Sequence, residues 1–360
     1  VVAGNTIQIR GLSDEGTLFG VYELLEQLGV RWFFPGPLGT VIPQSKDISV
    51  PEQRTVQVPS FKARRTTGGQ TSKPGEKEHR SAWQRRMRMG GPILPSAHGI
   101  DFPNQGKGYE FEKHPEYYSL INGERRDRQI CISNPEVIKA VIEMYKERIR
   151  NSASRDNPDA QSWTGIGPND GGGYCECSAC QALDAGDMDP FYGKISVTDR
   201  YVWFFNQILK GVDEEFPGKL KISFYAYSAY NRPPVREKPN PSIIPAFAPI
   251  NYCRIHGMGN PICPEQNRSC RWMIQEWHRM IPELYDRGYW FNLSDPGLLF
   301  PMVHRLRTQI PLSHELGITG WRVETPHQVI SDPPSLYVAA KLMWNHAADV
   351  DAGPVDDLID

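Results

Sequence analysis

The sequence lacks long hydrophobic runs, and it lacks an excess of charge of either sign. Its 40 Lys and Arg residues nearly balance its 42 Asp and Glu residues, which leaves a net charge of −2. This balance argues against a partner held mainly by charge, such as nucleic acid or an anionic membrane. The mean hydropathy is −0.50, and no apolar run approaches the roughly 18 residues of a membrane-spanning helix. We therefore predict neither a nucleic-acid partner nor a membrane span.

Motifs of several enzyme classes are also missing. No G-x-G-x-x-G follows a predicted strand, and the sequence contains no G-x-x-x-x-G-K-[ST], G-x-S-x-G or H-E-x-x-H. These motifs carry dinucleotide binding, phosphate binding, the nucleophile of α/β-hydrolases and a helical zinc site, in that order. We therefore predict no cofactor and no catalytic metal.

The chain opens on Val1, without an initiator Met, and runs directly into a strand-like segment. No basic segment with an apolar core and a small-residue cleavage site precedes that strand, so no signal peptide is visible. We expect the chain to be a piece of a longer precursor.

A small α/β unit is predicted over residues 1–58. Ile7 and Ile9 alternate in a short strand, and Ser13 stands where an N-cap precedes a helix with an acidic first turn. Gly29 occupies the position of a C-cap glycine. A proline-rich connector ends the unit.

Residues 59–348 alternate strands and helices, which predicts a (β/α)8 TIM-like barrel rather than a doubly wound sheet. The expected strands, in chain order, are SFKARRT, GGPILPSAHG, RQICIS, SWTGIG, KISFYAYS, INYCRIHG, GYWFNLSD and GITGWRVET. Expected helices include one capped by Asn134, one that opens at Thr198, and a final amphipathic helix over 334–346. Residues 349–360 would begin a C-terminal extension.

Candidate acids follow two of these strands, because barrel active sites lie at the carboxyl ends of the strands. Asn169 and Asp170 come after SWTGIG and before three glycines, which suits a ligand-binding loop as well as an Asx-turn. Glu324 shares one face of the last strand with Arg322, while Trp321 lies on the other face. Such an Arg–Glu pair is either structural or part of a substrate site.

Other polar and aromatic side chains lie near further strand ends. Together with Asn169, Trp321 and Arg322, the predicted substrate-binding residues are His98, Tyr225, Tyr227, His256, Asn292 and Asp295. The tyrosine rings suit stacking on the apolar faces of sugars, or they belong to the core. The Asn and Asp suit hydrogen bonding to a polyhydroxylated ligand, or they cap the segment past the strand. Two histidines at predicted barrel mouths favour a polar pocket there.

The seven cysteines form two groups and one single residue. Cys175, Cys177 and Cys180 make C-x-C-x-x-C, three more lie between 253 and 270, and Cys131 stands alone. In a secreted protein these would be disulfides with one odd thiol, whereas in a cytosolic protein the first group would suggest zinc. C-x-C-x-x-C supplies only three ligands, with no fourth visible nearby. We favour disulfides, and a metal site and buried free thiols stay open.

Two charged segments are predicted to be solvated and without function. ERRDR at 124–128 reads as a charged surface turn, and Asp184, Asp187 and Asp189 read as an acidic loop. The acidic loop lacks the full calcium-loop pattern.

Several segments resemble known families. IRGLSDEGTLFGVYELLEQLGVRWFFPGPLGTVIP resembles the small α/β domain that precedes the barrel in family 67 α-glucuronidases and family 20 hexosaminidases. HPEYYSLINGERR, ICISNP, GPNDGGGYCECSAC, VTDRYVWFFNQI and LYVAAKLMWN resemble the bacterial domain-of-unknown-function 4838 family, which is related to glycoside hydrolase family 163. The resemblance covers nearly the whole chain. It implies a secreted or periplasmic barrel enzyme that acts on oligosaccharides or on the glycans of glycoproteins.

The resemblance favours an endo-β-N-acetylglucosaminidase-like glycoside hydrolase. Hexosaminidases have adjacent Asp and Glu after the fourth strand, whereas this chain has Asn169 and Asp170 there, with Glu176 farther on. That departure puts an acetamido-assisted mechanism in question.

We predict Asp170 and Glu324 as the catalytic pair. Glu324 beside Arg322 should ionise readily and act as base or stabiliser, and Asp170 would be the acid if burial raises its pKa. The alternatives are an α-glucuronidase-like exo-hydrolase, a non-catalytic carbohydrate-binding barrel, and a metal-dependent enzyme that uses the C-x-C-x-x-C cysteines and a histidine.

Overall fold

A computed structural model describes residues 1–67, 75–95, 98–100, 108–152, 157, 161–295, 298–325 and 333–350, and every structural observation below refers to these residues. The chain divides into two compact units. The first comprises Val1–Pro92, Arg254–Ile262 and Tyr289–Asp360, and the second comprises Ile93–Cys253 and Cys263–Gly288. The predicted division into 1–58, 59–348 and 349–360 stays a prediction.

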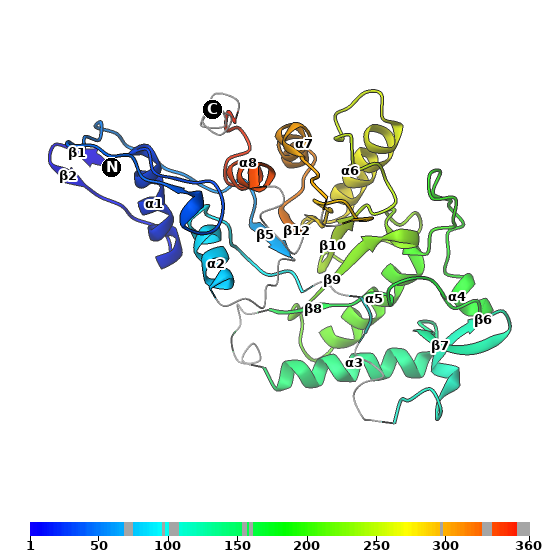
Figure 1. Cartoon of the computed structure of the whole chain (residues 1–360). Helices are drawn as coiled ribbons and strands as arrows, with labels where there is room; N and C mark the ends of the chain where they lie inside the picture. Colours follow the sequence, from blue (N-terminus) through cyan, green and yellow to red (C-terminus); the bar gives the residue numbers. More distant parts are fainter. Residues whose placement is uncertain are drawn as a thin grey trace. The chain divides into compact units, whose positions relative to one another are not determined.

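The first unit combines helices with short strands from both ends of the chain (Figure 1). Its elements are β1 (Val2–Ala3), β2 (Thr6–Ile7), α1 (Asp14–Gln27), β3 (Arg31–Trp32), η1 (Pro37–Gly39), β4 (Thr40–Val41), β5 (Ala63–Thr67), α2 (Glu76–Arg86), α7 (Val303–Glu315), β12 (Gly320–Glu324) and α8 (Pro333–Trp344). The predicted start of α1 is confirmed, because the Ser13 side chain accepts a hydrogen bond from the Gly16 N–H at 3.1 Å. Gly29 follows this helix with a positive φ of 89°, as a C-terminal glycine does.

The second unit holds the middle of the chain (Figure 1). Its elements are η3 (Pro115–Tyr117), β6 (Tyr118–Ile121), β7 (Glu124–Ile130), α3 (Pro135–Arg150), β8 (Ser162–Gly165), α4 (Ser178–Gln181), α5 (Thr198–Asp213), β9 (Leu220–Tyr227), η4 (Ser228–Tyr230), β10 (Ile243–Ala248), the π-helix η5 (Glu265–Cys270), α6 (Arg271–Met280) and β11 (Tyr285–Asp286). The predicted helix starts at Asn134 and Thr198 are confirmed. α3 packs closely on α5, where Gly211 faces Ile142 and leaves no room for a Cβ.

The main sheet has six parallel strands. In the second unit β8, β9, β10 and β11 pair in chain order, and in the first unit β5 pairs with β12 over five residues. All six residues of β10 are buried, as expected for a parallel strand covered on both faces. The protein is therefore a mixed α/β fold with a parallel half-barrel sheet, and the closed eight-stranded barrel stays a prediction.

Two predicted strands lie elsewhere than expected. INYCRIHG forms turns and bends, while the regular strand is β10, which precedes it and was not among the expected strands. GYWFNLSD contributes only an isolated bridge between Tyr289 and Glu324. The regular strand is β11, which ends two residues before Tyr289's neighbour Gly288. Pro245 sits inside the buried β10 and obscured its strand character in the sequence.

The third expected strand, RQICIS, is also corrected. Residues 124–130 form β7, which pairs antiparallel with β6 in a hairpin rather than joining the parallel sheet. Asn122 and Gly123 turn the chain with φ values of 51° and 81°, the conformation that an Asn-Gly hairpin turn favours. The segment ERRDR at 124–128 is therefore part of the strand β7 and does not form the predicted surface turn. In the segment GGPILPSAHG, Gly90 makes only an isolated bridge with Arg64.

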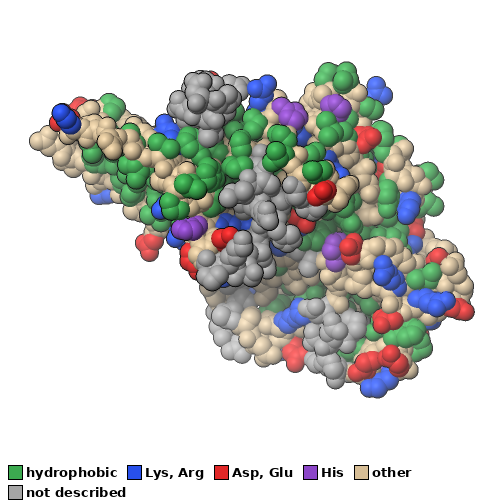
Figure 2. Space-filling view, in the orientation of Figure 1, with side chains coloured by type: hydrophobic (Ala, Val, Ile, Leu, Met, Phe, Trp, Pro, Cys, Tyr) green, Lys and Arg blue, Asp and Glu red, His purple; other side chains and the backbone are tan. Residues whose placement is uncertain are grey.

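On the face shown in Figure 2, acidic and basic side chains are interspersed among the described residues. This mixture matches the net charge of −2. None of the helices in the described part of the chain has the length and apolar character of a membrane-spanning helix.

Candidate functional site

The candidate site lies at the carboxyl ends of β8 and β9 in the second unit. Tyr225 and Tyr227 occupy alternate positions near the end of β9 and are half-buried, while Phe224 and Ala226 between them are fully buried. Strand alternation therefore turns both tyrosines to the same face. Asp170 follows β8 by five residues.

His98 joins these residues into one cluster. Its ring centre lies 5.0 Å from that of Tyr225 and 5.2 Å from that of Tyr227, with both contacts edge-on. Its Nε2 lies 3.9 Å from Oδ1 of Asp170. The guanidinium group of Arg287 lies over the Tyr225 ring at 5.4 Å. We call His98, Asp170, Tyr225 and Tyr227 the aromatic-acid cluster. Two aromatic rings beside a carboxyl group and an imidazole suit a polyhydroxylated ligand and proton transfer.

The loop that carries Asp170 is held by the end of β7. Gln129 Oε1 accepts the Asn169 N–H at 2.8 Å, and Gln129 Nε2 donates to the carbonyls of Asn169 at 2.9 Å and Gly172 at 3.2 Å. Asn169 Nδ2 donates to the Arg128 carbonyl at 2.5 Å, and Arg128 Nη2 donates to the Asp170 carbonyl at 3.1 Å. Asn169 therefore helps to position the loop. Gln129 and Arg128, which hold the loop by hydrogen bonds, were not among the residues predicted from the sequence.

The Asp170 carboxyl group itself is open to solvent. Its side chain is 66% exposed, and Oδ1 accepts the N–H of the next residue, Gly171, at 2.9 Å. The burial on which its role as an acid depended is therefore absent from the free protein. His98 is 34% exposed, so the cluster presents an open surface to a ligand.

The first unit carries a second set of candidates on β12. Trp321 and Val323 are fully buried, and Arg322 and Glu324 are half-buried on the other face, as the strand alternation predicted. Trp321 packs edge-on against Phe61 at 6.1 Å and belongs to the core. This burial argues against a contact with substrate, and the predicted role of Trp321 in substrate binding stays a prediction.

Asn292, Asp295 and His256 also lie in the first unit. Asn292 Oδ1 accepts the backbone N–H groups of Ser294 at 2.9 Å and Asp295 at 3.3 Å. Its side-chain oxygen therefore caps a turn, which was the alternative to ligand binding. Asp295 is exposed, and His256 is half-buried in a loop.

The structure thus brings part of the predicted site together. His98, Asn169, Asp170, Tyr225 and Tyr227 converge within the second unit. The second predicted catalytic residue, Glu324, belongs to the first unit. Their pairing stays a prediction.

The predicted acidic loop is not a solvated segment. Asp189 is 2% exposed and accepts the N–H groups of Phe191 and Tyr192 and the hydroxyl of Tyr252. The Asp184 carboxylate forms an ion pair with the buried Arg200. These acids hold the loop in place.

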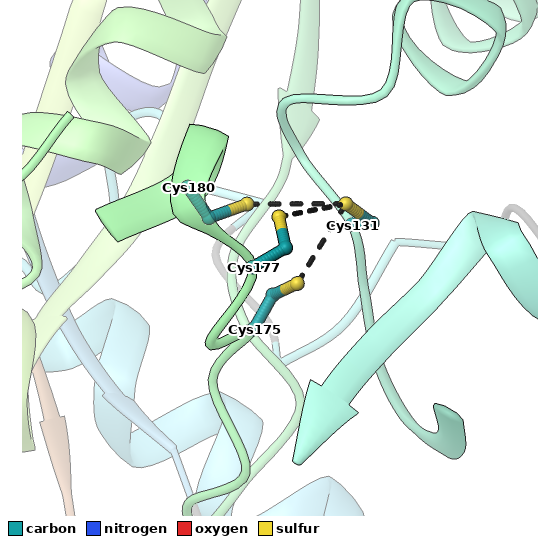
Figure 3. A group of neighbouring side chains, drawn as sticks. All are labelled: Cys131, Cys175, Cys177 and Cys180. Carbon is teal, nitrogen blue, oxygen red and sulfur yellow. Dashed lines mark hydrogen bonds between the residues drawn. The ribbon is translucent and has the colours of Figure 1, made fainter. Parts of the chain in front are cut away.

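A group of four cysteines lies next to the Asp170 loop (Figure 3). Cys131 Sγ is 3.6 Å from Cys175 Sγ, 3.8 Å from Cys177 Sγ and 3.9 Å from Cys180 Sγ. We call these residues the four-cysteine cluster. All are free thiols, and only Cys177 is more than slightly exposed. Cys131 is the fourth partner that the sequence pattern did not reveal, because it lies more than 40 residues before the others.

The thiols of the four-cysteine cluster influence one another. Hydrogen bonds with the Cys175 and Cys180 thiols lower the pKa of the Cys131 thiol. Contacts with Cys131 and Cys175, together with burial, raise the pKa of the Cys180 thiol.

Comparisons with known proteins bear on the family and the fold. A family described as Domain of unknown function (DUF4838) matches residues 34–357. No curated protein matches this chain. Among solved structures, the chain is similar to a family GH115 4-O-methyl-α-glucuronidase with specificity for decorated arabinogalactans, with 15% identity and a TM-score of 0.45. That alignment covers 93% of this chain and 46% of the glucuronidase, so this chain spans less than half of that protein's length.

Proposed function

The chain belongs to the DUF4838 family, and on this premise we propose that it is a glycoside hydrolase that cleaves O-glycosidic bonds in complex glycans. The observation that carries the proposal is the aromatic-acid cluster at the ends of β8 and β9. Its half-buried tyrosine rings offer apolar surface to a sugar ring, while Asp170 and His98 offer groups that exchange protons.

Hydrolysis of a glycosidic bond adds one water molecule across the bond between C1 and the leaving oxygen. A carboxylic acid gives its proton to the leaving oxygen, and a second group stabilises positive charge at C1 or activates the water. In our proposal Asp170 is the acid and Glu324, beside Arg322, is the second group. A glycan that covers the tyrosine rings would exclude water from Asp170 and supply the burial that the free protein lacks.

We further propose that the activity is endo-β-N-acetylglucosaminidase-like and that the chain acts outside the cytoplasm, secreted or periplasmic. Both statements rest on the resemblance of the sequence segments to family 163 relatives. The substrates would be the glycans of N-glycoproteins or oligosaccharides derived from them.

The experiment is a glycan-release screen by mass spectrometry. The protein is incubated with N-glycoproteins, glucuronoxylan and aryl glycosides, in parallel with Asp170→Asn and Glu324→Gln. Each amide variant should lower the rate by roughly 10²–10⁴-fold, the usual contribution of a general acid or base. Glu143→Gln, an acid-to-amide change on an exposed residue of α3, serves as the matched control and should keep wild-type activity.

Other outcomes would redirect or remove the proposal. Release of uronic acid instead of N-glycans would replace the endo-hexosaminidase with an α-glucuronidase-like exo-hydrolase. Glycan binding without turnover, unchanged in Asp170→Asn, would overturn the hydrolase and favour a carbohydrate-binding protein. The 66% exposure of Asp170 is the observation that makes this second function worth testing.

A further inference from the structure

The spacing of the sulfurs in the four-cysteine cluster matches a metal coordination shell. A tetrahedral zinc site with Zn–S bonds of about 2.3 Å has its sulfurs about 3.8 Å apart. The three separations from Cys131 are 3.6, 3.8 and 3.9 Å, and all four Sγ atoms lie within 4.8 Å of one another.

We propose that Cys131, Cys175, Cys177 and Cys180 bind a single zinc ion that fastens the Asp170 loop to the end of β7. The site lies wholly within the second unit. It does not depend on the proposed hydrolase activity, because the ion would have a structural role and four thiolates would leave it no open position for a substrate.

A disulfide explains the arrangement less well. One disulfide joins two sulfurs at about 2.05 Å and would leave the other two as buried thiols. In this cluster Cys131 is instead nearly equidistant from three partners that point toward it (Figure 3). Three nearly equal separations from one sulfur are what a single ion bound by all four sulfurs would produce.

The donor set selects the kind of metal. Four sulfurs without an oxygen ligand suit a soft or borderline ion with tetrahedral geometry, and exclude calcium or magnesium. Cys177 and Cys180 have the C-x-x-C spacing common in structural zinc sites. A multi-iron cluster needs its cysteines farther apart than these, so a single ion fits better.

Groups around the four-cysteine cluster can stabilise the negative charge of the bound thiolates. Four thiolates around Zn²⁺ carry a net charge of −2, which is costly to bury unless nearby groups stabilise it. The Leu120 N–H donates to Cys175 Sγ at 3.4 Å, and Ser133 Oγ lies 3.1 Å from Cys180 Sγ. Arg125 Nη1 lies 4.0 Å from Cys175 Sγ and brings a positive charge.

The ion would complete a set of links between two segments of the chain. Gln129 and Arg128 already hold Asn169, Asp170 and Gly172 by hydrogen bonds. Cys131 comes two residues after Gln129, and its three partners follow the loop directly. A metal at this point would fix the loop at its far end, where Gly171 and Gly173, with φ values of 92° and 85°, leave the backbone most freedom.

The test measures metal content and thiol state on the whole chain, purified without added metal or chelator. Elemental analysis should find about one zinc per chain. After denaturation with a chelator but without reductant, alkylation and peptide mapping should find Cys131, Cys175, Cys177 and Cys180 all modified. Two of these four left unmodified, with no zinc present, would overturn the proposal in favour of a disulfide.

Matched variants locate the ion. Cys177→Ser changes the least buried ligand and should reduce zinc to a small fraction of the wild-type content, while Cys177→His should retain it, because three cysteines and one histidine form a common zinc site. Ser178→Ala changes an exposed residue between Cys177 and Cys180 and should keep the zinc. Zinc that persists at wild-type content in both Cys177→Ser and Cys131→Ser would place the metal elsewhere and refute the assignment. Circular dichroism on each variant shows that it is folded.

Discussion

One cluster in the first unit pairs buried charges of opposite sign, whereas a cluster in the second unit gathers four cysteine thiols. Arg88 is 4% exposed, with Nη2 2.5 Å from Glu26 Oε2 and Nη1 3.0 Å from Glu23 Oε2. Lys341 forms an ion pair with the other oxygen of Glu26. We call Glu23, Glu26, Arg88 and Lys341 the ion-pair cluster.

The difference concerns what each cluster needs from outside the chain. The ion-pair cluster contains two cations and two carboxylates, so its charges balance without a further ligand. A cavity of about 520 Å³ lies beside it, lined in part by Glu26, Arg88 and Lys341. The four-cysteine cluster contains weak donors and weak acceptors only, and a bound cation would satisfy all four sulfurs at once. The charges of the ion-pair cluster balance within the chain, whereas in our proposal the four-cysteine cluster takes up a zinc ion.

Removing the metal should have the largest effect of any change on stability. Structural zinc sites in small peptides have apparent binding free energies of about 10–16 kcal/mol. Chelation, or Cys131→Ser, should therefore speed hydrogen exchange strongly in peptides over residues 118–134 and 169–182. Peptides over α1 and α8 in the first unit should exchange as before. Equally faster hydrogen exchange in both units would contradict the expectation that the metal stabilises the second unit alone.

Breaking the ion-pair cluster should cost less but still be severe. Glu26→Gln leaves Arg88 and Lys341 without their shared carboxylate, and an uncompensated buried charge costs about 3–5 kcal/mol. Glu23 is 26% exposed, and Glu23→Gln should cost about 1 kcal/mol, as a partly solvated pair does. Urea unfolding measures both. A chelator should change neither value for the first unit.

The hydrogen-bond clamp on the Asp170 loop should have an intermediate effect. Gln129→Leu removes three hydrogen bonds and leaves partly buried groups of Asn169 and Gly172 unpaired, at a cost of about 1–3 kcal/mol. The amides of residues 169–173 should then exchange faster while zinc content stays the same. Unchanged exchange would mean that the four-cysteine cluster alone holds the loop.

The smallest expected effect on stability comes from the protonation of His314 in the first unit at low pH. The His314 ring stacks on His346 at 3.8 Å, and burial together with the neighbouring His346 lowers the pKa of His314 below its usual 6.5. Since the unfolded chain then binds the proton more readily, stability should be full above about pH 6.5 and fall as the pH drops through 6.5 toward the lower folded value. Thermal unfolding at about pH 7.5 and about pH 5.5 measures this loss, and His314→Gln should reduce it. An equal loss in the variant would assign the effect to other groups.

Much of the fold followed from local sequence signals. Ser13 and Asn134 mark helix starts with side chains that cap, and SWTGIG, KISFYAYS and GITGWRVET became β8, β9 and β12. These signals are local, so they survive in any tertiary context. β10 was missed because burial on both faces removed the alternation that marks a half-exposed strand. The Asn122–Gly123 turn was a signal in the sequence that could have revealed the β6–β7 hairpin.

The sequence indicated which residues gather at the candidate site, but not the contacts that hold them in place. The prediction that active-site groups gather at strand ends selected His98, Asp170, Tyr225 and Tyr227, which the structure brings together. The burial of Trp321 in the core could not be predicted, because strand alternation tells which residues share a face but not which face is the core. Cys131 was missed because its distance along the chain from the other cysteines is closed only by the tertiary fold.

Zinc-edge X-ray absorption on the purified chain would show whether the four-cysteine cluster is a metal centre. We expect a first shell of four sulfurs at about 2.3 Å, and in Cys177→His a shell of three sulfurs and one nitrogen. A chain without zinc, or a zinc shell of nitrogen and oxygen only, would contradict this expectation.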